Sequence, residues 1–160
     1  MFSGGRVIYR FRCIFIATMT SPSYRLFVYG SLLSGFRHPA YQYISDYFHL
    51  IGPAQVRGVL FDMGEFPAAI PVTGDQFIKG ELYELKNQDE FGWAIAQLDD
   101  YEGVHGEMGE IALYRRDLVT VFCNGDSSDA WVYWYNGDVT GHPIIPSGDV
   151  LEYRNSKNSQ

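Results

Sequence analysis

Hydrophobic and polar positions alternate along much of the chain, and a period of two is typical of strands with one buried face. The longest example covers residues 49–62, where small and apolar residues occupy every second position and polar ones such as Gln55 and Arg57 fall between them. Pro53 is expected to bend this strand. Similar apolar patterns predict further strands over residues 25–29, 76–85, 111–123 and 129–136.

Turn-forming residues separate these strands. Residues 30–35 follow a short apolar run and predict a tight loop. Residues 63–75 contain two prolines and two glycines and also predict a loop. Residues 124–128 predict a hairpin-type loop that joins the last two strands.

The period changes to that of a helix over residues 88–101. Apolar residues recur there at the spacing of one helical face: Phe91, Ala94, Ile95, Leu98 and Tyr101. Gly103 is expected to end this helix. A shorter helix is predicted from Pro39 to about Phe48, because proline is well tolerated in a first turn.

These helices do not alternate regularly with the strands, so a layered α/β arrangement is not favoured. We predict an α+β fold, a small and mainly antiparallel β-barrel with flanking short helices. The 160 residues fit one domain. We expect it to span residues 19–154, followed by a frayed polar tail over residues 155–160.

The first residues have a different character. Three arginines, Arg6, Arg10 and Arg12, precede a short apolar run over residues 13–17. This run is too short for a signal peptide or for a membrane span. Because a strand pattern begins soon after Met19, residues 1–18 are expected to be a disordered or artefactual extension.

Charge and cysteine content exclude several classes of function. The formal net charge is −7 and the few basic residues are scattered, so nucleic acid is not an expected partner. No membrane partner is expected either. The two cysteines and four histidines show no metal-binding spacing. Cys123 lies within a predicted strand, which indicates a core thiol rather than a nucleophile.

The first candidate for chemistry is the segment Tyr29-Gly30-Ser31-Leu32. A glycine directly after a buried strand allows a sharp turn and a close approach of the backbone to a ligand. Successive N–H groups in such a turn can hold an anion. The alternative is an ordinary turn, and the local sequence leaves both interpretations open.

A second candidate is the acidic end of the predicted helix. Asp99 and Glu102 lie three residues apart, so they share a helix face, and like charges or burial would raise a carboxyl pKa. A carboxyl with a raised pKa suits general acid–base catalysis. The alternative is a solvated acidic helix end. Tyr114 and Arg116 form a third candidate, because either side chain could bind a carboxylate, or both could lie on an exposed edge strand.

These segments, in this order, resemble the γ-glutamylcyclotransferase-like superfamily and in particular its γ-glutamylamine cyclotransferase branch. The resemblance is carried by residues 28–32, 66–70, 79–83, 98–102, 114–116, 130–133 and 145–149. It implies a compact β-barrel without a metal or an organic cofactor. It also implies that Glu102 is the catalytic acid–base, and that substrate is bound by Tyr29, Gly30, Ser31, Leu32 and Tyr114.

The resemblance implies an acyl transfer within a small-molecule γ-glutamyl substrate, yielding 5-oxoproline and a free amine in the cytoplasm. A binding protein of the same fold that holds a small acid without turnover is an alternative. Another is a protein-interaction domain that uses exposed aromatic residues, namely Trp131, Trp134 or Tyr135. The identity of the leaving amine and the oligomeric state are not predicted.

Overall fold

The computed structural model describes residues 23–36, 38–106 and 108–160. The predicted extension over residues 1–18 lies outside the described residues. The strands are β1 (Arg25–Val28), β2 (Phe48–Asp62), β3 (Pro67–Pro71), β4 (Phe77–Leu85), β5 (Tyr114–Cys123) and β6 (Asp126–Tyr135). The helices are the 3-10 turns η1 (Ser34–Phe36) and η2 (Gln88–Glu90), and α1 (Ala40–Tyr47), α2 (Phe91–Glu102) and α3 (Val150–Asn158).

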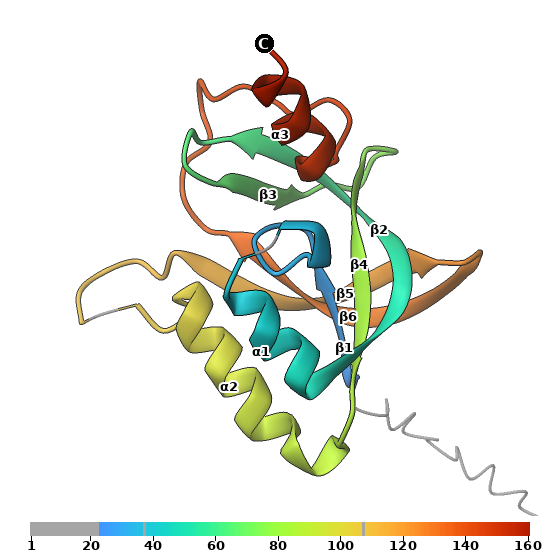
Figure 1. The fold of residues 1–160 in the computed structure, drawn as a ribbon. Coiled ribbons are helices and arrows are strands. Elements are labelled where there is room, and N and C mark those ends of the chain that lie inside the picture. Colours follow the sequence, from blue (N-terminus) through green and yellow to red (C-terminus); the bar gives the residue numbers. More distant parts are fainter. Residues whose placement is uncertain (1–22, 37, 107) are drawn as a thin grey trace, which may run out of the picture.

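Five of the strands close into a small barrel in the order β2-β4-β1-β6-β5, and pairing between β5 and β2 completes the ring. β1 runs parallel to β6, whereas the other pairs of the ring are antiparallel. The predicted α+β barrel with short flanking helices is therefore confirmed. Figure 1 shows the long β2 curving across the barrel, with α1 and α2 along one side and α3 near β3.

Because apolar residues alternate with polar ones, one face of each strand packs into the barrel. The largest fully buried side chains include Trp134, Tyr83, Phe27, Leu26 and Ile78, which come from three neighbouring strands. At Gly80, a β-carbon would lie 2.1 Å from the carbonyl oxygen of Val28, so this close approach of β4 to β1 requires glycine.

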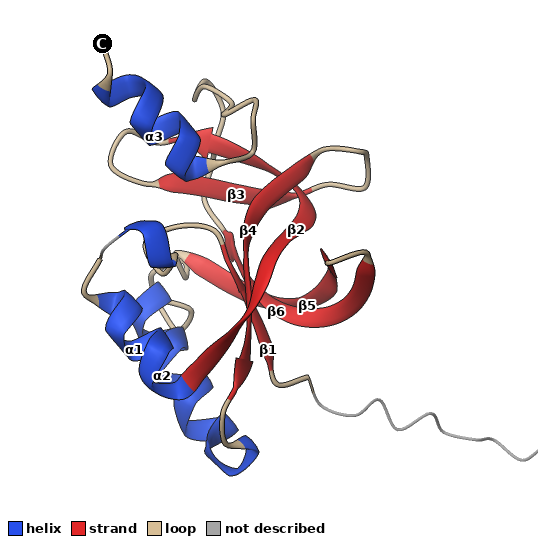
Figure 2. Cartoon of the chain, turned by 45° about the vertical axis from the view of Figure 1, so that its right-hand side comes forward, coloured by secondary structure: helices blue, strands red, loops and turns tan. Residues whose placement is uncertain are grey.

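The 63–75 segment, predicted as a loop, contains β3, which pairs antiparallel with the far end of β2. Its prolines, Pro67 and Pro71, lie at the two ends of this edge strand, where a missing N–H is tolerated. Figure 2 shows β3 and α3 together at one end of the molecule. The period-two pattern is too short there to reveal the strand.

Two other boundaries differ from the prediction. The hairpin between β5 and β6 turns over Asn124 and Gly125 alone, and both have positive φ angles, 54° and 82°. Two-residue turns of that conformation match the twist of the strands they join. Residues 155–158, for which the sequence predicts a frayed tail, continue α3. Asp149 stabilises the start of α3, since its carboxylate accepts hydrogen bonds from the N–H groups of Leu151 and Glu152.

The tryptophans of β6 are not exposed as an interaction surface would require. Trp134 is 1% exposed. Trp131 is partly buried, and its indole N–H donates a 2.9 Å hydrogen bond to the carbonyl oxygen of Ser23. Tyr135 packs against Phe66 and Tyr114. None of the described helices is long and apolar enough to cross a membrane.

Candidate active site

A tight turn follows β1 and forms one wall of a small cavity. The N–H of Leu33 donates a 2.9 Å hydrogen bond to the carbonyl oxygen of Gly30, which closes the turn. The buried side chains of Leu32 and Leu33 anchor it to the core. The N–H groups of the two central residues, Ser31 and Leu32, take no part in this closing bond, and such N–H groups can bind an acceptor.

The second wall is the end of α2. Gly103 terminates this helix in the left-handed conformation, with a φ of 72°, so Glu102 is its last residue. A 2.9 Å hydrogen bond joins the Ser31 hydroxyl to the hydroxyl of Tyr101. The helix end and the turn are therefore linked directly, although about seventy residues separate them in the sequence.

The cavity between these walls has a volume of about 230 Å³. Every residue assigned to the site from the sequence lines it: Tyr29, Gly30, Ser31, Leu32, Glu102 and Tyr114. The sequence reasoning did not assign several other lining residues to the site, among them His38, Glu65, Phe66, Tyr101 and Tyr133. Phe66, Tyr101 and Tyr133 belong to segments that carry the family resemblance, so that signal was available.

Glu102 is a mostly buried carboxyl group. Burial raises its pKa from the ordinary 4.5 to about 7. Among the described residues no hydrogen-bond donor or cation pairs with this carboxyl. A group with these properties can accept and return a proton near neutral pH.

Asp99 belongs to a hydrogen-bond network, although its three-residue spacing from Glu102 suggests that it raises the pKa of that carboxyl. Asp99 is 5% exposed, and its carboxylate accepts two hydrogen bonds from Arg116, at 2.8 and 3.1 Å. The hydroxyl of Tyr133 donates a third, at 2.7 Å. The raised pKa of Glu102 has burial as its cause, so the predicted like-charge contribution from Asp99 is not found.

This network also decides between the two carboxylate-binding candidates on β5. Arg116 is engaged by Asp99, and its guanidinium lies 4.5 Å from the centre of the Trp131 ring. Arg116 therefore has a structural partner and does not line the cavity, so the prediction that it could bind a ligand carboxylate finds no support. Tyr114 lines the cavity itself.

Three tyrosines surround Glu102 and remain protonated. Burial raises the pKa of Tyr29, Tyr114 and Tyr133, and in each case the nearby Glu102 carboxyl contributes in the same direction. Two of these hydroxyls already have partners, since Tyr29 donates a 2.5 Å hydrogen bond to the carbonyl oxygen of Tyr133, and Tyr133 donates to Asp99. The Tyr114 hydroxyl is thus the best placed to donate to a bound molecule.

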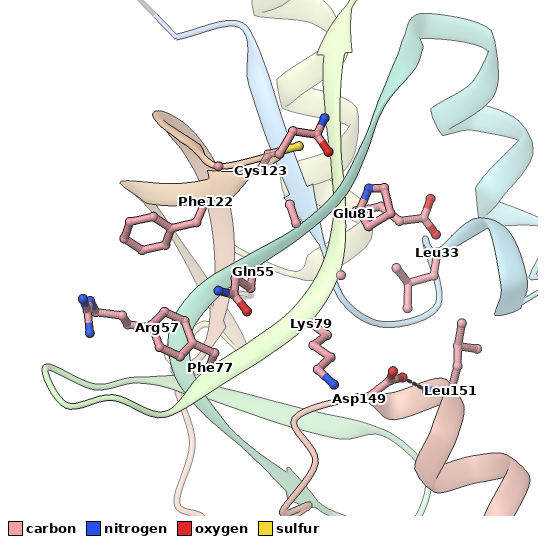
Figure 3. Close-up of a pocket in the computed structure, with 15 residues that line it drawn as sticks. Leu33, Gln55, Arg57, Phe77, Lys79, Glu81, Phe122, Cys123, Asp149 and Leu151 are labelled. Carbon is pink, nitrogen blue, oxygen red and sulfur yellow. Dashed lines mark hydrogen bonds between the residues drawn. The ribbon is translucent and has the colours of Figure 1, made fainter.

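A larger cavity of about 670 Å³ lies on the outer face of β2 and β4. Figure 3 shows Arg57 beside Phe77 and Phe122, with Lys79 on the neighbouring part of β4. The guanidinium of Arg57 lies 5.1 Å from the centre of the Phe77 ring. Neither Glu102 nor the turn after β1 lines this cavity, apart from Leu33 at the end of that turn. Of the two cavities, the smaller one is therefore the one lined by the carboxyl group with a raised pKa.

Comparison with known proteins agrees with this geometry. Residues 26–153 match the family described as "Gamma-glutamyl cyclotransferase, AIG2-like". The chain belongs to this γ-glutamylcyclotransferase family. The protein "Gamma-glutamylcyclotransferase family protein YtfP" of Escherichia coli K12 is 31% identical over 135 residues, which cover 80% of this chain and 96% of that protein.

Solved structures of the family share the fold. The solution structure of ytfP from Escherichia coli has a TM-score of 0.56 and 30% identity, over 81% of this chain and 98% of that one. The crystal structure of an AIG2-like protein from Mus musculus also has a TM-score of 0.56, at 24% identity, over 79% of this chain and 88% of that one. The closed barrel is thus the fold of this γ-glutamylcyclotransferase family.

Proposed function

We propose that the protein cyclises the γ-glutamyl group of a small amide or peptide to 5-oxoproline and releases the amine, with Glu102 as general acid–base. The observation that carries the proposal is the mostly buried Glu102 carboxyl, with its pKa raised to about 7, in a cavity whose facing wall is the turn after β1. Membership of the family supports this class of reaction.

In the proposed reaction, the α-amino nitrogen of the substrate attacks its own γ-carbonyl carbon. Ionised Glu102 removes a proton from that nitrogen as the new carbon–nitrogen bond forms. The same proton then passes from Glu102 to the leaving nitrogen as the original amide bond breaks. One amide replaces another, so no oxidant, reductant or cofactor is consumed.

The pKa of Glu102 suits both halves of this cycle. A carboxyl with a pKa near 4.5 would be a weak base, whereas one at about 7 is partly ionised at neutral pH and also a competent acid. General acid–base help of this kind typically contributes roughly a hundredfold to ten-thousandfold in rate.

The turn after β1 supplies the complementary partner for negative charge. We propose that the N–H groups of Gly30, Ser31 and Leu32 hold the substrate carboxylate or the developing oxyanion, and that the Tyr114 hydroxyl assists. Holding the two ends of the γ-glutamyl group together makes ring closure effectively unimolecular, an advantage of up to roughly 7–11 kcal/mol for an ideal arrangement. The cavity of about 230 Å³ suits a small group such as this one.

The test is a 5-oxoproline release assay across γ-glutamyl amines, γ-glutamyl dipeptides and γ-glutamyl-lysine. The variant Glu102→Gln should lower turnover at least roughly a hundredfold while the protein stays folded. Asp100→Asn is the matched control, because this exposed carboxyl lies on the same helix turn and does not line the site cavity.

Normal turnover by Glu102→Gln would show that another group performs the acid–base step. Thermal stabilisation of the wild-type protein by 5-oxoproline, with no amine released from any compound of the panel, would identify it instead as a small-acid binding protein.

A further inference from the structure

The central segment of β4 makes contacts that the proposed mechanism does not use. Glu81 receives three hydrogen bonds through its carboxylate. The N–H and the hydroxyl of Ser34 donate to its Oε1 at 3.0 and 2.8 Å. The buried Tyr83 donates its hydroxyl to Oε2 at 2.6 Å. Ser34 directly follows the turn that forms the anion-holding wall, so Glu81 ties the far end of that turn to the barrel.

The near end of the same turn is also fixed by β4. Val28, the last residue of β1, pairs with Glu81 in the antiparallel register. Gly80 allows this approach, because any β-carbon there would collide with the Val28 carbonyl oxygen at 2.1 Å. Gly80 and Glu81 of β4 thus fix both ends of the turn: the end of β1 before it and Ser34 after it.

Glu81 does not line the cavity that contains Glu102; it lines the larger cavity on the outer face. Figure 3 shows its side chain extending from β4 toward the segment that carries Leu33. Glu81 can therefore act on a ligand in the smaller cavity only indirectly, through neighbours such as the turn.

We propose that Glu81 is a positioning residue that orients the N–H groups of Ser31 and Leu32 toward the anionic group of the substrate. This inference rests on the proposed function. Hydrogen bonds to a charged acceptor are stronger than neutral ones, and the three bonds on this carboxylate fix its orientation as well as that of Ser34. Without them the turn keeps its backbone closure, its two buried leucines and the hydrogen bond between the Ser31 and Tyr101 hydroxyls.

The experiment compares Glu81→Ala with Glu81→Gln. Alanine removes every bond to Ser34. Glutamine can keep them, because its carbonyl oxygen accepts from Ser34 and its amide can donate to the Tyr83 oxygen. We expect Glu81→Ala to raise the dissociation constant of 5-oxoproline and the KM of the best γ-glutamyl compound roughly tenfold or more. Glu81→Gln should keep both constants within a few-fold of the wild-type values, because it retains the hydrogen bonds.

Two further variants complete the comparison. Ser34→Ala keeps only the backbone bond to Glu81 and should give an intermediate effect, which preserves the test if Glu81→Ala fails to fold. Glu84→Ala is the control, since Glu84 lies on the same strand and pairs with Arg25 at the surface, at 3.4 Å. It should leave both binding constants unchanged.

Amide hydrogen exchange of Ser31 and Leu32 supplies the readout that does not depend on turnover. Glu81→Ala should speed exchange at these two amides and spare those of the barrel strands. If the wild-type protein releases no 5-oxoproline, the proposed function fails, while exchange still decides whether Glu81 orders the turn.

Unchanged exchange at both amides would overturn the role of Glu81. So would a fall in kcat that merely follows the folded fraction with KM unchanged, because that result indicates a stabilising residue and not a positioning one.

Discussion

Replacing Glu102 by glutamine should stabilise the protein above neutral pH, because the substitution removes a charge that is costly to bury. Burial raises the pKa of Glu102 from 4.5 to about 7 in the folded protein, whereas the unfolded chain exposes this carboxyl to water. Between these two values the folded state binds more protons than the unfolded state. The free energy of unfolding therefore falls as pH rises through this window.

The size of the effect follows from the two pKa values. Each pH unit of difference corresponds to about 1.4 kcal/mol, so the wild-type protein loses up to about 3 kcal/mol between pH 4.5 and pH 7 through this one group. Solvent reaches part of the Glu102 side chain, so this figure is an upper value. In a domain of this size it corresponds to a difference in Tm of roughly 6–12 °C.

Urea unfolding of wild type and Glu102→Gln, followed by circular dichroism from about pH 5 to pH 8, measures the difference directly. The advantage of the variant should grow across this range and level off above the folded-state pKa. Asp100→Asn should show no such growth, since Asp100 is exposed. A stability difference that stays the same from acid to alkaline pH would refute the idea that Glu102 is a buried carboxyl with a raised pKa.

Two further substitutions test the support of the site. Arg116→Ala leaves the buried Asp99 without its cation and should cost roughly 3–5 kcal/mol in urea unfolding. Arg115→Ala removes an exposed pair and should cost less than about 1 kcal/mol, so equal losses would contradict the assigned network. Gly80→Ala should prevent folding or strongly lower the Tm, because its β-carbon would lie 2.1 Å from a carbonyl oxygen of β1. Gly92 lies in open space on α2, so Gly92→Ala should be neutral or stabilising. A tolerated Gly80→Ala would show that β1 and β4 can separate.

The amino-acid sequence by itself determined the local elements of this protein. Alternation set the long strands and helical spacing set α2, because each depends on neighbours within a few residues. The sequence predicted the hairpin between the last two strands but placed its loop over residues 124–128, whereas the turn consists of Asn124 and Gly125 alone. The resemblance also pointed to part of the lining of the smaller cavity, namely the turn after β1, Glu102 and Tyr114, but not to His38 or Glu65. The short edge strand β3 and the helix α3 were not predicted, because their patterns are too brief or too polar.

Only the tertiary structure decided what depends on contacts between distant segments. Periodicity does not reveal that β5 pairs with β2, or that β1 runs parallel to β6, and these pairings close the barrel. The partners of charged side chains also depend on the tertiary structure. Asp99 and Glu102 look equivalent in sequence, yet β5 brings Arg116 to Asp99, and no cation of the described part of the chain pairs with Glu102. A carboxyl's pKa depends on its burial and its partners, so the structure, not the spacing, separates the paired acid from the one suited to catalysis.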